Sequence, residues 1–265
     1  MRIIVLIKQV PDLRQGKFGF TKDGRIDRAN LAKMMNPDDI HAVEAALSLK
    51  DQYGGKVITL CMGPPTANEI LNDTLDIGVD ETYLVSDRIL GGADTLATAY
   101  TLFKAIQKIG KFDLIMGGLK AIDGETGQTL PQVAEFLHIE SLGPIEKILS
   151  IDKSNKRLVV RSIFERGYMI LDSHFPAVIA VAPTYYDPRD PTLINKINAK
   201  KKKAIILNSE NINFDIKKVG LPGSPTKWIS SLLNPTSGAR KIKMIGQDIS
   251  LDQFINKLKE EKIID

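Results

Sequence analysis

Apolar runs and amphipathic segments alternate along the first half of the chain. The apolar runs are short, rich in β-branched residues and bounded by turn residues, which is typical of buried strands. The segments between them carry apolar residues at helical spacing, and Asn36 followed by Pro37 indicates a helix start. The predicted strands are Arg2–Ile7, Lys56–Met62, Glu81–Val85 and Phe112–Met116, and the predicted helices are Pro37–Tyr53, Thr66–Ile77, Asp94–Ile109 and Gln128–Leu137. This alternation indicates parallel βαβ units, and therefore an α/β fold with a mostly parallel sheet.

The pattern changes from about Ile145, where apolar segments follow one another with turn residues and no helix between them. Ser154-Asn155 and Arg166-Gly167 are typical hairpin turns. We therefore expect antiparallel strands that extend the sheet. These predicted strands are Lys147–Asp152, Leu158–Glu165, Tyr168–Ser173 and Ala177–Ala182, and the segment Tyr185–Leu193 that follows is rich in proline and aspartate and predicts an exposed loop.

The composition changes again beyond Gly220. Trp228, Leu232 and Leu233 lie in a polar stretch without periodicity, and Leu251–Ile263 predicts a final helix. Such a tail lacks enough apolar residues for a core of its own. We divide the chain into an α/β domain, residues 1–220, and a C-terminal arm, residues 221–265, which either wraps a partner subunit or packs back on its own domain.

Composition narrows the class of protein. In the 265 residues, 43% are hydrophobic and 26% are charged, and no apolar run approaches the roughly 20 residues of a membrane span. The short run Ile3–Ile7 is interrupted by Lys8, so we interpret it as a first strand and not as an export signal, and we expect a cytoplasmic protein. A single cysteine, Cys61, excludes an internal disulfide, and the three histidines lack ligand spacing.

The net charge of +4 is concentrated at Lys200–Lys203, just after Lys196. Because no aromatic residues lie among these lysines, a nucleic-acid site is disfavoured. A solvated run before a strand at Ala204–Leu207 is the favoured interpretation, and a docking patch for an acidic partner is the intermediate one.

One stretch carries most of the candidate chemistry. The strand at Phe112–Met116 is followed by Gly117-Gly118, Asp123-Gly124 and Gly127, and then by the start of a helix. Glycines let the backbone approach a phosphate, and the first N–H groups of a helix point at it. The polar side chains that could bond a ribose or position a phosphate are Asp123, Glu125, Thr126 and Gln128. The sequence predicts a nucleotide-phosphate site here; the alternative is a tight turn whose polar residues only cap the helix.

A second loop, Ser86–Thr98, also follows a strand and opens a helix. Asp94 can cap that helix, and Thr95 and Thr98 lie on one face of it. Alone, the loop is most simply an ordinary capped helix start. The carboxyl ends of parallel strands meet at one edge of a sheet, so both loops can hold one long nucleotide there. Because no nucleophile–base pair is evident, any chemistry is expected to come from a cofactor.

Several motifs together resemble the beta subunit of electron transfer flavoproteins, from one end of the chain to the other. They are Val5–Asp12, Met35-Asn36-Pro37, Cys61–Pro64, Gly118–Gln128, Phe175–Val178 and Pro188–Lys203. The resemblance implies a doubly wound nucleotide-binding fold. It also implies a heterodimer with an alpha subunit that carries an FAD.

Beta subunits of this family hold either AMP or a second FAD. Asp87-Arg88 and Gly92–Thr98 are similar to the motif of the FAD-holding group, which bifurcates electrons. The resemblance then implies that NADH is the donor and that ferredoxin or flavodoxin takes one electron. The other passes through the alpha-subunit FAD to an acyl-CoA dehydrogenase, a 2-hydroxy acid dehydrogenase or a quinone reductase. The nucleotide contacts it implies are Leu6, Asn36, Met62, Asp94, Thr95, Thr98, Gly118, Asp123, Gly124, Glu125, Thr126, Gly127 and Gln128.

The family's partner-recognition loop matches the residues before the lysine run, and its anchoring leucine matches Leu193. This chain departs from the usual T-L-P-N-I pattern, because Ile194 replaces the proline and Lys196 is added. Arg166, at a hairpin tip, is a second departure that either tunes a flavin or is merely exposed. The alternatives to bifurcation are a beta subunit with structural AMP, or a stand-alone AMP- or ATP-binding regulatory domain.

Overall fold

The computed structural model describes residues 1–12, 14, 31–226 and 250–264. The chain divides into two compact units: Met1–Phe18 with Asp27–Lys227, and Gly19–Ile26 with Trp228–Asp265. The first unit contains every strand of the described residues, and the second contributes one described helix.

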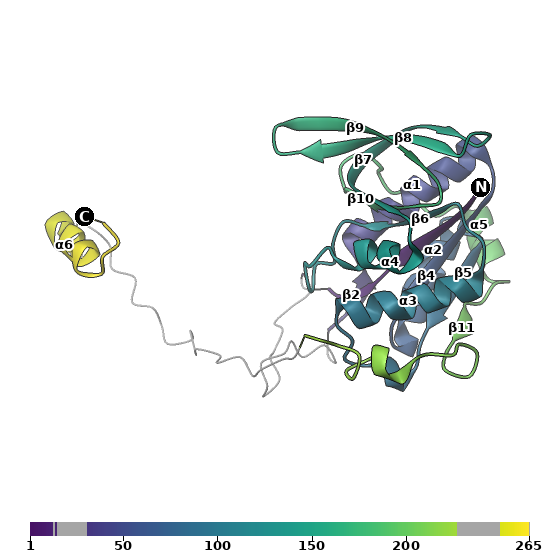
Figure 1. Ribbon diagram of the computed structural model, residues 1–265, viewed down its shortest axis with the longest axis horizontal. Helices are drawn as coiled ribbons and strands as arrows, with labels where there is room; N and C mark the ends of the chain where they lie inside the picture. The colour runs from purple at the N-terminus through teal and green to yellow at the C-terminus, as the bar shows by residue number, and fades with distance from the viewer. Residues whose placement is uncertain (13, 15–30, 227–249, 265) are drawn as a thin grey trace. The chain divides into compact units, whose positions relative to one another are not determined.

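The first unit is built on a nine-stranded sheet with the order β11-β5-β4-β1-β6-β10-β7-β8-β9 (Figure 1). The strands are β1 (Arg2–Ile7), β4 (Lys56–Met62), β5 (Glu81–Val85), β6 (Leu114–Gly118), β7 (Glu140–Asp152), β8 (Arg157–Phe164), β9 (Gly167–His174), β10 (Ala177–Val181) and β11 (Ile205–Leu207). All neighbouring strands from β11 to β7 pair in parallel, and only the pairs β7–β8 and β8–β9 of this sheet are antiparallel. A separate pair, β2 (Gln9–Pro11) and β3 (Lys33–Met35), is antiparallel and was not predicted.

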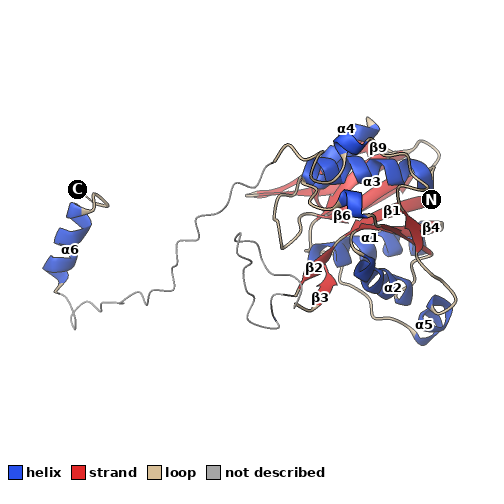
Figure 2. Ribbon diagram, turned by 90° about the horizontal axis from the view of Figure 1, so that it is seen from below, coloured by secondary structure: helices blue, strands red, loops and turns tan. Residues whose placement is uncertain are grey.

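Helices cover both faces of the sheet, as Figure 2 shows: α1, α2 and α5 lie on one side, and α3 and α4 on the other. Their bounds are α1 (Pro37–Tyr53), α2 (Asn68–Asp76), α3 (Thr95–Ile109), α4 (Thr129–Leu137) and α5 (Leu193–Ala199). Alternate residues of β1 divide between the two cores: Ile3 and Val5 pack with α1, and Ile4 and Leu6 pack with α3. The doubly wound, mostly parallel α/β fold is therefore confirmed.

Strand β6 begins and ends two residues later than predicted. Asp113 lies outside the strand, and its carboxylate accepts a hydrogen bond from the backbone N–H of Arg2 at 2.7 Å. At the other end, Gly117 and Gly118 continue the pairing with β10, opposite Ala180 and Val181. The glycines that were expected to form the turn therefore belong to the strand.

The prediction that Ala177–Ala182 is antiparallel was wrong. β10 lies between β6 and β7 and is parallel to both. All five of its residues are buried, as expected for a strand covered on both faces. β7 begins at Glu140, earlier than predicted, because its first residues pair with β10 before the rest pairs with β8.

Two other segments differ locally. The helix predicted from Thr66 begins as a 3₁₀ turn, Pro65–Ala67, and becomes α-helical at Asn68. The predicted loop before the lysine run ends at Thr192, whose hydroxyl accepts a hydrogen bond from Asn195 N at 3.2 Å and caps α5. Leu193 is therefore the first residue of a short helix, and Lys200–Lys203 are exposed ahead of β11, as predicted.

In the second unit, α6 (Leu251–Glu260) begins with a capping box. Ser250 Oγ accepts from Gln253 N at 3.2 Å, and Gln253 Oε1 accepts from Ser250 N at 3.0 Å. The helix ends before the predicted Ile263, because the chain turns at Lys262, where φ is +53°. Trp228, Leu232 and Leu233 lie outside the described residues. The described residues include no helix with the length and hydrophobicity of a membrane-spanning segment.

Candidate functional site

Three parallel strands and two loops meet at a cavity of about 420 Å³ at the carboxyl edge of the sheet. Strands β1, β4 and β6 supply its floor, the loop after β5 supplies one wall, and the loop after β6 supplies the other. This is the convergence that the sequence predicted. The predicted site residues that line the cavity are Leu6, Met62, Asp94, Thr95, Thr98, Gly118, Gly124, Glu125, Thr126, Gly127 and Gln128.

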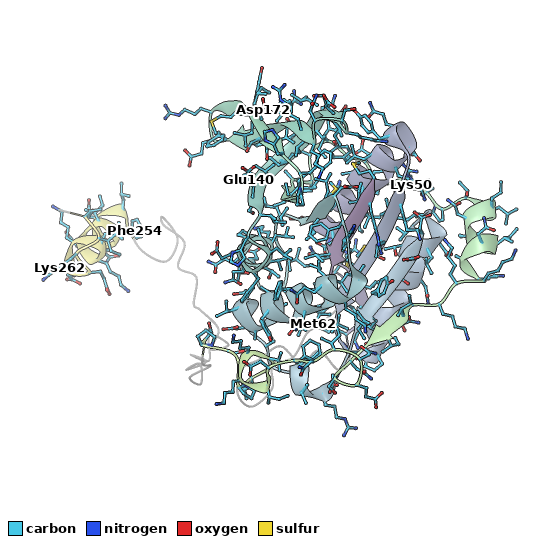
Figure 3. The ribbon with its side chains drawn as sticks, turned by 45° about the vertical axis from the view of Figure 1, so that its right-hand side comes forward. Lys50, Met62, Glu140, Asp172, Phe254 and Lys262 are labelled. Carbon is cyan, nitrogen blue, oxygen red and sulfur yellow. The ribbon has the colours of Figure 1, made fainter. Side chains whose placement is uncertain are left out.

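The cavity lies away from the antiparallel extension. Figure 3 shows Met62, at the carboxyl end of β4, far from Asp172 of β9. Asp172 is paired with Arg157 on the neighbouring strand β8. The extension therefore contributes no cavity-lining residue within the described part of the chain.

Asn36 does not line the cavity, but its side chain is hydrogen-bonded to the cavity loop that follows β6. Its side-chain N–H donates to the Lys120 carbonyl at 2.9 Å, and its oxygen accepts from Ile122 N at 3.1 Å. The prediction that Asn36 and Pro37 start α1 is confirmed: Asn36 occupies the N-cap position, although its side chain accepts no hydrogen bond from the first turn of the helix. Its amide is instead bonded to the glycine-rich loop after β6.

Two carboxylates in the first turn of α1 bind the same loop. Asp38 accepts from Lys120 N at 3.2 Å, and Asp39 accepts from Gly118 N at 3.1 Å and from Lys8 N at 2.8 Å. Asp39 therefore joins the carboxyl ends of β1 and β6. A side chain at Gly118 would lie 2.5 Å from Asp38 Cβ, so only glycine permits this approach.

Asp123, the other predicted residue outside the lining, forms an ion pair beneath the loop. Its Oδ1 lies 2.6 Å from Lys8 Nζ, and its side chain is 1% exposed, whereas that of Lys8 is 46% exposed. Lys8 lines the cavity and so places a positive charge there. A second, exposed pair, Lys120 Nζ to Glu125 Oε1 at 3.3 Å, lies on the rim.

The two helix N-termini at the cavity differ in what occupies them. Asp94 caps α3, because its Oδ1 accepts from Ala97 N at 3.0 Å. The N-terminus of α4 has no side-chain cap, and within the described ranges the N–H groups of Thr126, Gly127 and Thr129 donate no hydrogen bond. Unpaired N–H groups at a helix start attract an anion. The α4 end is therefore open to a phosphate, and the α3 end is already occupied by a carboxylate.

Burial and hydrogen bonding shift two carboxyl groups in opposite directions. Burial raises the pKa of Asp39 from 3.8 to about 7, although hydrogen bonding from the Asn36 side chain and from the N–H groups of Lys8 and Gly118 opposes the rise. Burial also acts to raise the pKa of Asp94, but N–H groups from Ala97 and Thr226 outweigh it and hold that pKa below its ordinary value. Asp94 is therefore ionised at neutral pH, and its negative charge lies at the N-terminus of α3, where the helix dipole favours it.

A family comparison agrees with this geometry. The family described as electron transfer flavoprotein domain matches residues 23–210, which is most of the chain. The chain belongs to the electron transfer flavoprotein family. It is similar to caffeyl-CoA reductase-Etf complex subunit CarD of Acetobacterium woodii, with 37% identity over 267 residues. It is also similar to electron transfer flavoprotein subunit beta of Clostridium acetobutylicum, 35% over 264 residues, and to acryloyl-CoA reductase electron transfer subunit gamma of Anaerotignum propionicum, 35% over 271 residues. Each similarity covers 100% of both chains.

Some cavity residues of this electron transfer flavoprotein subunit were not predicted. Lys8 and Asp39 supply its unpredicted charges, and Leu90 and Leu130 supply apolar lining. Lys8 could have been found, because it directly follows a predicted strand, as the two predicted loops do. Asp39 could not, since nothing in a helix-starting Pro-Asp-Asp sequence shows which carboxylate turns toward the sheet.

Proposed function

We propose that this chain is the beta subunit of an electron-bifurcating electron transfer flavoprotein and that its cavity holds FAD. NADH would be the electron donor, with ferredoxin or flavodoxin as one acceptor and a flavin-containing dehydrogenase, reached through the alpha-subunit FAD, as the other. The open α4 N-terminus beside a glycine-lined cavity carries the proposal. A cavity of about 420 Å³ is within the usual range for a cofactor site.

The residues present suit a nucleotide with a phosphate. The N–H groups of Thr126, Gly127 and Thr129 would hold the phosphate, and Lys8 would balance part of its charge. Gly124 has open space around its Cα, so it leaves room for a ligand. Thr95 and Thr98 supply hydroxyls on the opposite wall, while Asp94 fixes the helix that carries them.

Bound FAD supplies hydride acceptance and one-electron transfer, and the chain supplies position and electrostatics. Asp39 fixes the cavity floor by joining Lys8 N to Gly118 N. Asn36 and Asp38 fix the loop from Gly118 to Ile122. The cavity extends between two loops that follow different strands, which suits a dinucleotide better than AMP.

We also propose that α5 docks the dehydrogenase. Leu193 is 75% exposed and Ile194 is 71% exposed, and Lys196 follows them on the same short helix. An apolar pair beside the exposed Lys200–Lys203 run suits a partner with an apolar pocket and an acidic rim. Two relatives are named for caffeyl-CoA and acryloyl-CoA reductase complexes, so we expect an acyl-CoA dehydrogenase or reductase as the partner.

The C-terminal arm, predicted as residues 221–265, would bind the alpha subunit. The first compact unit continues to Lys227, so the proposed contact begins beyond that residue. The full-length similarity to electron transfer subunits disfavours a stand-alone regulatory domain.

Counting nucleotides tests the proposal. The purified complex of this chain with its alpha subunit is denatured, and the released FAD and AMP are quantified by chromatography. Two FAD per heterodimer are expected. One FAD with one AMP would refute FAD binding and bifurcation, and would leave the AMP-holding alternative.

A further inference from the structure

The segment Val219–Thr226 lies directly against the loop that precedes α3. Leu221 N donates to the Gly91 carbonyl at 3.0 Å, and Thr226 N donates to Asp94 Oδ2 at 3.0 Å. Asp94 N donates in turn to Ser224 Oγ at 2.8 Å. Both the backbone and the carboxylate of Asp94 are thus held by residues more than a hundred positions later in the chain.

Ser224 is the centre of this contact. It is buried, and its hydroxyl donates to the Gly220 carbonyl at 2.8 Å while it accepts from Asp94 N. A serine hydroxyl has one donor and two acceptor sites, so this arrangement uses its donor fully. Ser224 does not line the cavity, but Gly92, Asp94 and Thr95 do. Its effect on a ligand must therefore pass through that loop.

The segment and the loop also approach each other closely, at two glycines. Gly220 has φ of +56°, and a Cβ there would lie 2.1 Å from the Ile89 carbonyl oxygen. On the other side, a Cβ at Gly92 would lie 3.3 Å from Leu221 Cβ. Only glycine at residue 220 allows the chain to pass close enough for the Ser224 hydrogen bonds to form.

We propose that Ser224 is a positioning residue of the cavity, which sets the loop Gly91–Asp94 and the N-terminus of α3 for nucleotide binding. This inference rests on the proposed function, that the cavity holds a nucleotide. Because the segment Val219–Thr226 holds the loop Gly91–Asp94 by hydrogen bonds, the conformation in which the loop binds a nucleotide depends on that segment. By linkage, a nucleotide in the cavity stabilises the segment in return.

The test compares Ser224→Ala with Ser162→Ala in the full-length complex with the alpha subunit, stripped of nucleotide and titrated with FAD and with AMP. Ser162 is the matched control: it is also buried, and its hydroxyl donates to the Pro144 carbonyl at 3.0 Å, but it lies on β8. Leaving Asp94 N without its acceptor should weaken nucleotide affinity in Ser224→Ala by about tenfold. Ser162→Ala should bind as the unmodified chain does, and Ser224→Thr, which keeps the hydroxyl, should restore affinity.

The outcomes separate the two proposals. If the unmodified complex binds no FAD in this subunit, the proposed function is refuted, whether or not AMP binds there. If it binds FAD and Ser224→Ala binds FAD equally well, the positioning role is refuted and the proposed function stands. Should Ser224→Ala fail to fold, hydrogen exchange of the unmodified complex decides: the Asp94 amide must gain protection when nucleotide is added. Unchanged exchange at Asp94 would refute the positioning role.

Discussion

Asp39 gives the sharpest test of how the cavity floor is built. Its buried carboxyl accepts hydrogen bonds from Lys8 N at 2.8 Å and Gly118 N at 3.1 Å, and so holds two strand ends together. The substitution Asp39→Asn keeps the shape but changes the chemistry. Asparagine has one oxygen and one NH₂ group, so it can accept from only one of the two N–H groups. The second N–H group then faces the asparagine NH₂ group, which is also a donor, and this lowers the free energy of unfolding by about 1–3 kcal/mol.

The pH dependence follows from the raised pKa of Asp39. A pKa of about 7 in the folded state against 3.8 in the unfolded state means that the folded state holds the extra proton between these values. The free energy of unfolding therefore falls as pH rises through this window, from full stability below about 3.8 to the lowest contribution above about 7. The size of the fall is about 4 kcal/mol. The side chain of Asp39→Asn does not titrate, so this contribution to the pH dependence of the free energy of unfolding is absent from the variant.

The two effects together predict a crossover. Near pH 4 the unmodified chain should be more stable than Asp39→Asn, by about 1–3 kcal/mol. Near pH 8 the unmodified chain carries a buried charge, and Asp39→Asn should be equally stable or more stable. Urea unfolding of the full-length chain at pH 4, 6 and 8, followed by circular dichroism, measures the difference directly.

The control is Ser162→Ala, which loses a buried hydrogen bond and removes no titratable group, so its stability should follow that of the unmodified chain in parallel. A difference between the unmodified chain and Asp39→Asn that stays constant from pH 4 to pH 8 would refute the reasoning. It would show that the two N–H groups keep the carboxylate ionised in spite of burial.

Three further predictions concern a glycine at the cavity floor, the proposed docking helix and the C-terminal arm. Gly118→Ala should destabilise the chain by about 1–3 kcal/mol in thermal or urea unfolding, because its Cβ would lie 2.5 Å from Asp38 Cβ. The control Gly124→Ala should be nearly neutral, because a Cβ there would have no atom within 4 Å. Equal losses of stability in the two variants would contradict the steric argument. Leu193→Ala should weaken dehydrogenase docking by about thirtyfold and leave NADH reduction of the complex unchanged in stopped-flow traces. The control is Ile216→Ala, which also removes an exposed apolar side chain. If NADH reduction and electron delivery to the dehydrogenase are both slowed, the substitution has damaged the fold. A chain ended after Lys227 should keep its bound nucleotide but fail to co-purify with the alpha subunit, and normal co-purification would refute a role for the arm in assembly.

Much of the fold could be predicted because its signals are local. β1, β4, β5 and α1 begin and end at the predicted residues, since buried parallel strands and a proline-started helix leave short, unambiguous patterns. The two cavity loops were found because each follows a strand and opens a helix. The parallel sheet then brings such loops to one edge, whatever their side chains do.

The tertiary structure decided which partner each polar group takes. β10 has the pattern of any apolar strand, and only its insertion between β6 and β7 makes it parallel. Asn36 has the sequence context of a helix cap, but the loop after β6 offers it two better-placed backbone partners. Ser224 bonds to Asp94 across 130 positions in the chain. A hydrogen bond depends on the positions of its two groups in space, and local sequence spacing does not predict a partner so far away in the chain.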